Sequence, residues 1–264
     1  MWEYSFSFED LEIFLLIVVR MASFVVTAPF FSIRNVPRRF KAGLSIFLAL
    51  IVYAVMPVHS PLSYNTVYGY AALVLKEAMT GLIIGWGANL IESVMSFAGR
   101  LADMEIGLSM VQLLDPSTNN PVGFTGIMYQ YVVSLMMVIT GMHHYFIRAM
   151  IETYNLIPIG GARFDSEKIN LAIIQFLRDY MSIAFRLCLP VVVAIMLTNV
   201  VLGILAKSAP QINMFSVGVQ IKIFAGFAIL FITVYVLPNI TDFIFREMKA
   251  MMTVMVESMA RSPV

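Results

Sequence analysis

A row of small and polar residues runs through the apolar stretch between Tyr70 and Gly107, and it limits the possible folds more than any other feature. A helix over this stretch is about 55 Å long at 1.5 Å per residue, beyond the roughly 30 Å hydrocarbon core of a bilayer. Steps of three and four residues place the row on one helix face, and its members are Glu77, Gly81, Gly85, Ala88, Asn89, Glu92, Ser96, Gly99 and Asp103. Carboxylates on this face are costly against lipid. We therefore expect this face, the polar stripe, to contact protein or water.

The composition is that of a membrane protein. Of 264 residues, 60% are hydrophobic and 12% are charged, against about 25% charged in soluble domains. The net charge is +1 and long basic runs are absent, which excludes a general attraction to nucleic acid. The single cysteine, Cys188, excludes an internal disulfide and a cysteine-based metal cluster.

Six apolar runs predict an all-α fold of membrane-length helices. The runs are Leu11–Ile33, Ala42–Val58, Val67–Ile91, Val122–Ile147, Tyr180–Ala206 and Phe215–Leu237. The segment Ile157–Asp179, with its balanced charges, predicts a solvated connector with a short amphipathic helix. Lys and Arg in the later connections give no consistent charge bias, so six conventional membrane spans are weakly supported.

Charges inside these runs require partners. Glu77 is the clearest case, and Arg20 or Arg186, each within another apolar run, is the expected counter-ion. The motif formed by Gly81 and Gly85 allows close approach of another helix or subunit. Metal binding by His143 and His144 is disfavoured, since neighbouring residues point about 100° apart on a helix.

The segment Gly107–Gly126 predicts irregular backbone, because proline, glycine and asparagine recur in it. It nevertheless holds several apolar side chains. Irregular backbone cannot lie in lipid unpaired, so we expect this segment inside protein or across a cavity. After Pro238, five methionines from Met248 to Met259 predict the packing face of a terminal amphipathic helix.

The residues singled out above, taken in their order along the chain, resemble the FliR family of flagellar export-gate subunits, which has relatives in virulence type III secretion. The likeness covers nearly the whole chain, and Ala209–Asn213 is its most specific part. The matching positions are Pro29, Arg34–Arg38, Glu77, Gly81, Gly85, Gly99, Asp103, Gly107, Asp115, Pro116, Gly141–His144, Pro158–Gly160, Leu189, Pro190, Asn199 and Gly203–Phe215.

The resemblance implies long membrane-type helices arranged as hairpins in a hetero-oligomeric helical export gate, with 1–264 as one export-gate domain. Residues 1–180 would be P-like and residues 181–264 would be a Q-like C-terminal hairpin. The implied partners are flagellar P-type and Q-type gate subunits, B-type and A-type export proteins, and unfolded flagellar proteins that pass through. The implied place is the basal body in the bacterial inner membrane, largely on its periplasmic side. No catalysis, cofactor or metal is implied.

The resemblance also assigns residue roles. Residues 107–121 would form a plug that seals the pore, since an apolar constriction dewets and excludes ions; its residues are Leu108, Met110, Val111, Leu113, Leu114, Asp115 and Pro116. A helix-packing or pore face would use Glu77, Gly81, Gly85, Asn89, Glu92, Gly99 and Asp103. A partner-binding or bend motif would use Pro210, Gln211, Asn213 and Phe215.

Three alternatives stay open at this stage. A small-solute permease would use broken helices, for which Pro29, Pro190 and Arg186 are available. The corresponding subunit of a virulence secretion system is the second, and a scaffold protein without a pore is the third. Neither a phosphate-binding loop nor a nucleophile elbow occurs in the sequence, so an enzyme has no visible machinery.

Overall fold

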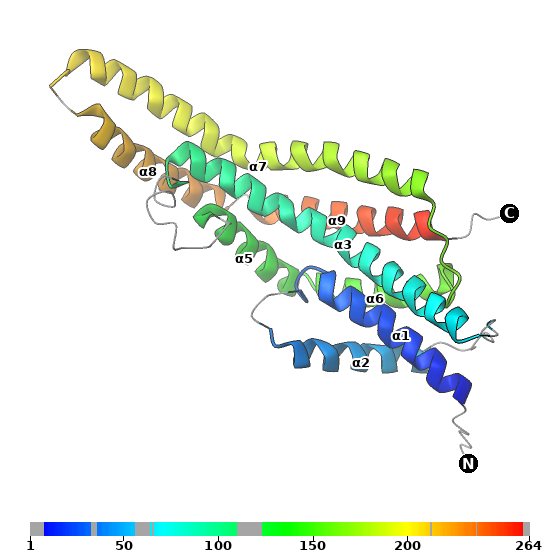
Figure 1. Ribbon diagram of the computed structural model, residues 1–264. Coiled ribbons are helices and arrows are strands. Elements are labelled where there is room, and N and C mark those ends of the chain that lie inside the picture. Colours follow the sequence, from blue (N-terminus) through cyan, green and yellow to red (C-terminus); the bar gives the residue numbers. More distant parts are fainter. Residues whose placement is uncertain are drawn as a thin grey trace. The chain divides into compact units, whose positions relative to one another are not determined.

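The computed structural model describes residues 8–32, 36–55, 64, 66–109, 123–211, 213–235 and 237–260, and all regular structure in these ranges is helical (Figure 1). The all-α prediction is confirmed. The helices are α1 Phe8–Thr27, α2 Arg38–Val55, α3 Val67–Ile106, α5 Phe124–Ile139, α6 Met142–Leu156, α7 Ser166–Ser208, α8 Met214–Thr233 and α9 Leu237–Met259.

The predicted run Val122–Ile147 is wrong as a single helix. The helix stops at Ile139 and a second begins at Met142. Gly141 between them has a φ of 69°, in the left-handed region that favours glycine. The amide of His144 then donates to the Gly141 carbonyl at 3.0 Å and starts the next helix.

The connector expected up to Asp179 is also wrong, since α7 begins at Ser166 and continues for 43 residues. Asp165 caps this helix: the amides of Glu167 and Lys168 donate to its Oδ1 at 3.1 and 3.3 Å. No proline or glycine follows before Pro190, so the helix has no reason to end near Tyr180.

Three helices are long and apolar enough to cross a membrane, namely α3, α7 and most of α8, where the passing segment is Ser216–Thr233. Counting α5 and α6 as one broken span gives four. Within the described residues, α1 and α2 have 20 and 18 residues but are not among the helices that are also apolar enough to cross.

The chain divides into two compact units by its contacts. Unit 1 holds Met1–Leu90, Gly141–Gln175 and Glu247–Val264, and unit 2 holds Ile91–Thr140 and Phe176–Arg246. The expected boundary between P-like and Q-like parts, near residue 180, lies inside α7 and is marked by no linker.

In unit 1, α1 and α2 pack against each other (Figure 1). The rings of Phe14 and Tyr53 meet edge to face at 6.0 Å. Before α3, the hydroxyl of Tyr64 donates to the carboxylate of Glu12. This hydrogen bond raises the pKa of Tyr64 to about 12.

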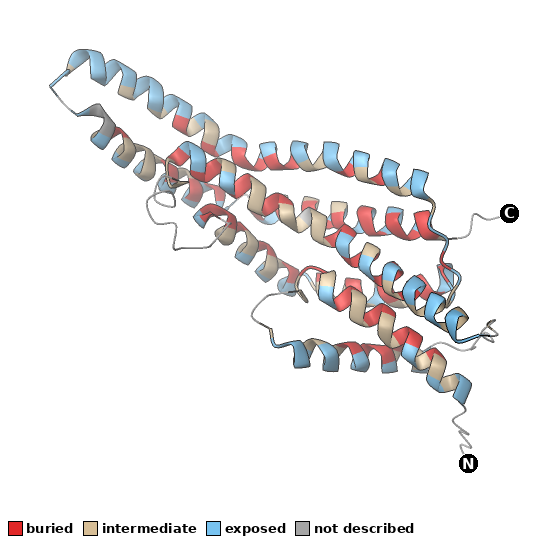
Figure 2. Cartoon of the chain, viewed as in Figure 1, coloured by how far each residue is buried: buried red, intermediate tan, exposed pale blue. Residues whose placement is uncertain are grey.

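In unit 2, α7 and α8 form a hairpin, with the Leu202 side chain 3.6 Å from the position of a Cβ on Gly218. The rings of Phe124 and Phe227 join α5 to α8 at 5.8 Å. Near the turn, the α7 arm of this hairpin is drawn mostly as exposed in Figure 2. Seven of the exposed apolar side chains on α7 and α8 are here called the hairpin surface: Met196, Leu197, Val200, Val201, Ile204, Phe224 and Phe231.

Candidate functional site

Glu77 and Arg20 form a buried ion pair between α3 and α1. Arg20 donates from Nε to Oε2 at 2.5 Å and from Nη2 to Oε1 at 2.9 Å. Both side chains are 0% exposed. The paired geometry is the strong form of an arginine–carboxylate contact. Of the two arginines considered from the sequence, the structure therefore places Arg20 on Glu77, while Arg186 belongs to unit 2.

The turn after α6 completes this buried pair. Arg20 Nη1 donates to the Ile157 carbonyl at 3.1 Å, and the Gly160 amide donates to Glu77 Oε1 at 2.8 Å. The guanidinium carbon also lies 4.1 Å from the Tyr154 ring centroid. Two charges and two main-chain groups thus satisfy one another, as buried polar groups must. Sequence reasoning named Gly160 as a family position but predicted neither its contact with Glu77 nor that of Tyr154 with Arg20.

The Gly81 and Gly85 motif packs against α1 within the same chain. A Cβ on Gly81 would collide with the Arg20 carbonyl oxygen, and one on Gly85 with the Thr27 hydroxyl. One step further along the stripe, Asn89 Nδ2 donates to the Thr27 carbonyl at 2.7 Å. This part of the polar stripe is therefore a helix-packing face inside unit 1.

In unit 2, Asp103 of α3 caps the start of α5. The Thr125 amide donates to both carboxylate oxygens at 3.2 Å, and the Thr125 hydroxyl donates to Oδ1 at 2.5 Å. The N-cap residue, Gly123, has no side chain to do this. A Cβ there would occupy the place of the Asp103 carboxylate. Asp103 therefore supplies from a neighbouring helix the acceptor that a cap residue ordinarily provides.

Gly99 brings α3 and α5 into backbone contact. A Cβ on Gly99 would collide with the backbone of Gly126, which leaves no room for any other residue. Nearby, Gln130 Nε2 donates to the Ser96 hydroxyl at 2.8 Å. The other carboxylate of the stripe, Glu92, is half-buried in unit 2. The stripe thus continues as a packing face between α3 and α5.

The expected plug falls mainly outside the described residues. Leu108 is described and half-buried. Met110, Val111, Leu113, Leu114, Asp115 and Pro116 lie outside the described residues. What the structure does give is the flank on each side, through the contact of Asp103 with Thr125.

The motif Pro210, Gln211, Asn213 and Phe215 lies at the turn between α7 and α8. The side chain of Asn213 caps α8, since the Ser216 amide donates to Asn213 Oδ1 at 3.4 Å. Pro210 and Gln211 are in the turn, and nothing is described of the Phe215 side chain. The described part of the motif therefore forms the hairpin turn.

The methionines of α9 include a buried group in unit 1. The side chains of Met255 and Met251 lie 3.0 and 3.6 Å from the position of a Cβ on Gly87. Within the described residues, no three His, Cys, Asp or Glu side chains come together where a metal ion could bind.

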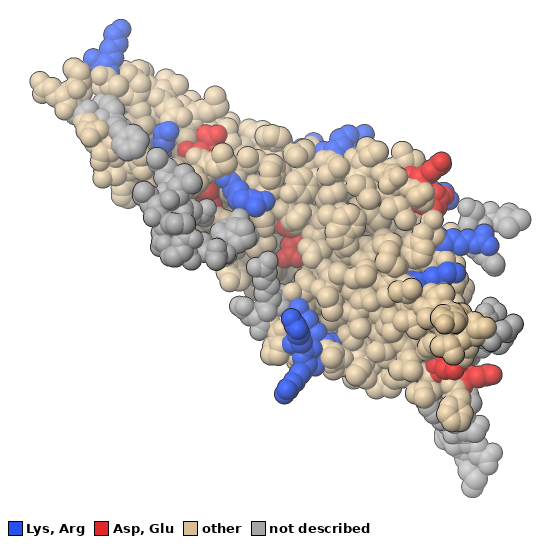
Figure 3. Space-filling view, in the orientation of Figure 1, with Lys and Arg blue, Asp and Glu red and all other residues tan. Residues whose placement is uncertain are grey.

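The exposed surface of this chain is largely apolar. Figure 3 shows Lys, Arg, Asp and Glu side chains in only a few places on the face in view. Large apolar side chains are exposed instead, among them Phe224 at 77% and Phe231 at 69%. Such surfaces in contact with water are unfavourable and mark contacts with protein or lipid.

Comparison with known proteins gives the family of this chain. The family model of the bacterial export proteins, family 1, matches residues 11–248. The chain is 31% identical to the flagellar biosynthetic protein FliR of Bacillus subtilis over 226 residues, 85% of this chain and 86% of that protein. It is 26% identical to FliR of Escherichia coli over 234 residues, 87% of each. It is 25% identical to FliR of Aquifex aeolicus over 234 residues, 88% of each.

Proposed function

Since the chain belongs to family 1 of the bacterial export proteins, the family of the flagellar biosynthetic protein FliR, we propose that it is a subunit of the flagellar type III export apparatus. In this proposal it forms, with P-type and Q-type subunits, the pore through which unfolded flagellar proteins leave the cell. The family match favours an export subunit over the alternative of a small-solute permease. The similar proteins are flagellar, which favours a flagellar over a virulence system.

One contrast within the structure supports a place in a hetero-oligomer. The buried charged side chains of each unit have partners within that unit: Arg20 pairs with Glu77, and Asp103 accepts from Thr125. The hairpin surface, by comparison, is left uncovered. A chain whose buried charges are paired internally and whose apolar helix faces are uncovered is suited to packing beside other helices by shape and small residues. B-type and A-type export proteins belong to the same proposal.

Location follows from the same features. Apolar helices and family membership indicate a membrane protein, with three or four helices able to cross by length and composition. We place it in the inner membrane at the flagellar basal body, with the assembled gate largely on the periplasmic side. The P-like part, residues 1–180, and the Q-like hairpin, residues 181–264, remain part of this proposal.

For pore closure, we propose that the apolar residues of 107–121 form the plug. The sequence supports this, and the capping of α5 by Asp103 anchors the described residues on both flanks. The test is deletion of Met110–Asn119. The deletion is expected to leave assembly with the partner subunits intact, because the packing residues of α3 and α5 are untouched, and to make the membrane leak ions.

Ion leakage is measured as loss of membrane potential in cells that produce the deleted subunit with its partners. A matched control carries Gly43→Ala, at a site in α2 with open space around it. A deleted subunit that assembles and remains ion-tight refutes the plug. A chain that is functional alone, without other export proteins, refutes the gate itself.

A further inference from the structure

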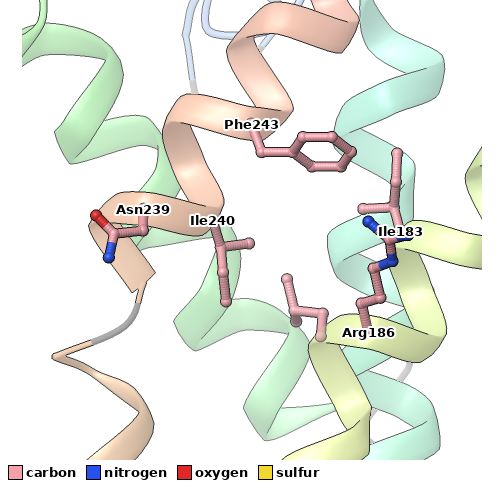
Figure 4. Close-up of a pocket in the computed structure, with 6 residues that line it drawn as sticks. Ile183, Arg186, Asn239, Ile240 and Phe243 are labelled. Carbon is pink, nitrogen blue, oxygen red and sulfur yellow. The ribbon is translucent and has the colours of Figure 1, made fainter.

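A cavity in unit 2 brings one arginine together with apolar walls. It has a volume of about 220 Å³ and lies between α7 and the first turns of α9 (Figure 4). Its lining residues are Ile183, Arg186, Leu187, Asn239, Ile240 and Phe243. In Figure 4 the guanidinium of Arg186 and the ring of Phe243 point into the space between the two helices, while the Asn239 side chain points away.

Arg186 is an exposed residue of α7, and its charge has no partner among the residues that the structure describes. Arg20, by contrast, makes three hydrogen bonds with its guanidinium. A guanidinium presents a planar set of donors that fits the oxygens of a phosphate or a carboxylate. The open donors of Arg186 therefore favour an anionic group.

The walls beside this cation are apolar. Ile183 and Leu187 are 3% and 1% exposed, so they form fixed sides, and Ile240 and Phe243 are half-buried. A small inorganic anion has no use for such walls, whereas a molecule with a charged head and an aliphatic stem uses both. The volume is below that of sites for drug-sized ligands, so it suits a head group and not a whole lipid.

The position of Arg186 along α7 agrees with the binding of a lipid head group. Between Arg186 and Lys207, residues 187–206 are a run of 20 without a charge. At 1.5 Å per residue this run measures about 30 Å, the thickness of the hydrocarbon core. With α7 across a membrane, Arg186 lies where lipid head groups begin.

We propose that this cavity binds the phosphate group of an anionic phospholipid, with the guanidinium of Arg186 on the phosphate and the apolar walls on the adjoining aliphatic carbons. The inference adds a ligand site to the export subunit and does not depend on the proposed pore. A carboxylate from a partner helix is the competing occupant, and free phosphate is the other source of the same chemistry.

The test titrates the full chain, purified in detergent, with phosphatidylglycerol, with phosphatidylcholine and with inorganic phosphate, and counts bound molecules by native mass spectrometry. Saturable binding of phosphatidylglycerol is expected. Arg186→Ala is expected to weaken it about tenfold or more, the loss typical of a charged hydrogen bond. Lys207→Ala is the matched control, since it removes an exposed cation from the same helix outside the cavity and is expected to change affinity less than twofold.

A second variant keeps the charge and fills the space. Ile240→Trp is expected to weaken phosphatidylglycerol binding as much as Arg186→Ala does, which a general attraction to a positive surface would not show. Equal affinities in wild type and Arg186→Ala overturn the proposal. Competition by inorganic phosphate at equal concentration also overturns it. A variant Arg186→Ala that loses its partner subunits but binds lipid as the wild type does overturns it as well.

Discussion

Replacing Glu77 by glutamine tests the buried ion pair that joins α1, α3 and the turn after α6. The change keeps the shape of the side chain and removes its charge. In the native pair both carboxylate oxygens accept from Arg20, and Oε1 also accepts from the Gly160 amide. A glutamine amide has one acceptor, so either orientation sets its NH₂ group against at least one of these donors.

The magnitude follows from burial. Arg20 is 0% exposed, so its charge cannot return to water without local unfolding. Removing one partner of a buried pair costs about 3–5 kcal/mol. Since 1 kcal/mol shifts the Tm of a domain of 150–250 residues by about 2–4 °C, Glu77→Gln is expected to lower the Tm by about 6–20 °C.

The assay is thermal unfolding of the full chain in detergent, followed by circular dichroism at 222 nm, with Asp179→Asn as the control. Asp179 pairs with Arg178 at 3.4 Å, but their side chains are 37% and 76% exposed. Exposed pairs contribute about 0–1 kcal/mol, so this control is expected to shift the Tm by less than about 4 °C.

A double variant separates the pair from its surroundings. Arg20→Met with Glu77→Leu removes both charges, and its loss is expected to be smaller than the sum of the two single losses, because neither charge is left alone. A Glu77→Gln shift no larger than that of Asp179→Asn, or losses that add, would refute the reasoning.

Two further predictions concern unit 2. Gly99→Ala is expected to destabilise unit 2 by about 1–3 kcal/mol, because the new Cβ meets the Gly126 backbone. Gly43→Ala, at a site in α2 with open space around it, is the control and is expected not to destabilise the protein. The Tm values of the two variants check this prediction, and equal values contradict it. Asp103→Ala is expected to speed amide hydrogen exchange at Thr125 about 5- to 30-fold, because the loss of a cap costs about 1–2 kcal/mol. Asp103→Asn keeps an acceptor and is expected to retain most of the protection; unchanged exchange in Asp103→Ala would exclude the cap.

The fold class followed from composition and periodicity, because an apolar chain without strand patterning has few ways to satisfy its backbone. The ends of the helices were predicted less well from the sequence. The charges after Ser166 indicated a solvated connector, yet a charged stretch without breakers continues a helix as readily as it leaves one. The Thr140–Gly141 break carried a local signal, the glycine, that the apolar pattern around it obscured.

The candidate site was likewise predictable only in part. That Glu77 needed a cation was predictable from the cost of an isolated charge in an apolar run. Which arginine would supply it was not, because Arg20 and Arg186 are equivalent by sequence pattern and only the packing of α1 on α3 decides between them. Asp103 was singled out by its place in the polar stripe, but its partner Thr125 is on another helix, and no spacing rule connects them.

The central claim is that this chain completes its apolar helix faces with unlike partners. The most direct measurement is the mass of the intact particle obtained when the chain is produced together with P-type and Q-type subunits and purified in detergent. The account predicts one particle that contains this chain and both other subunits, and a poorly behaved chain when it is produced alone. A stable, monodisperse single chain under both conditions would contradict it.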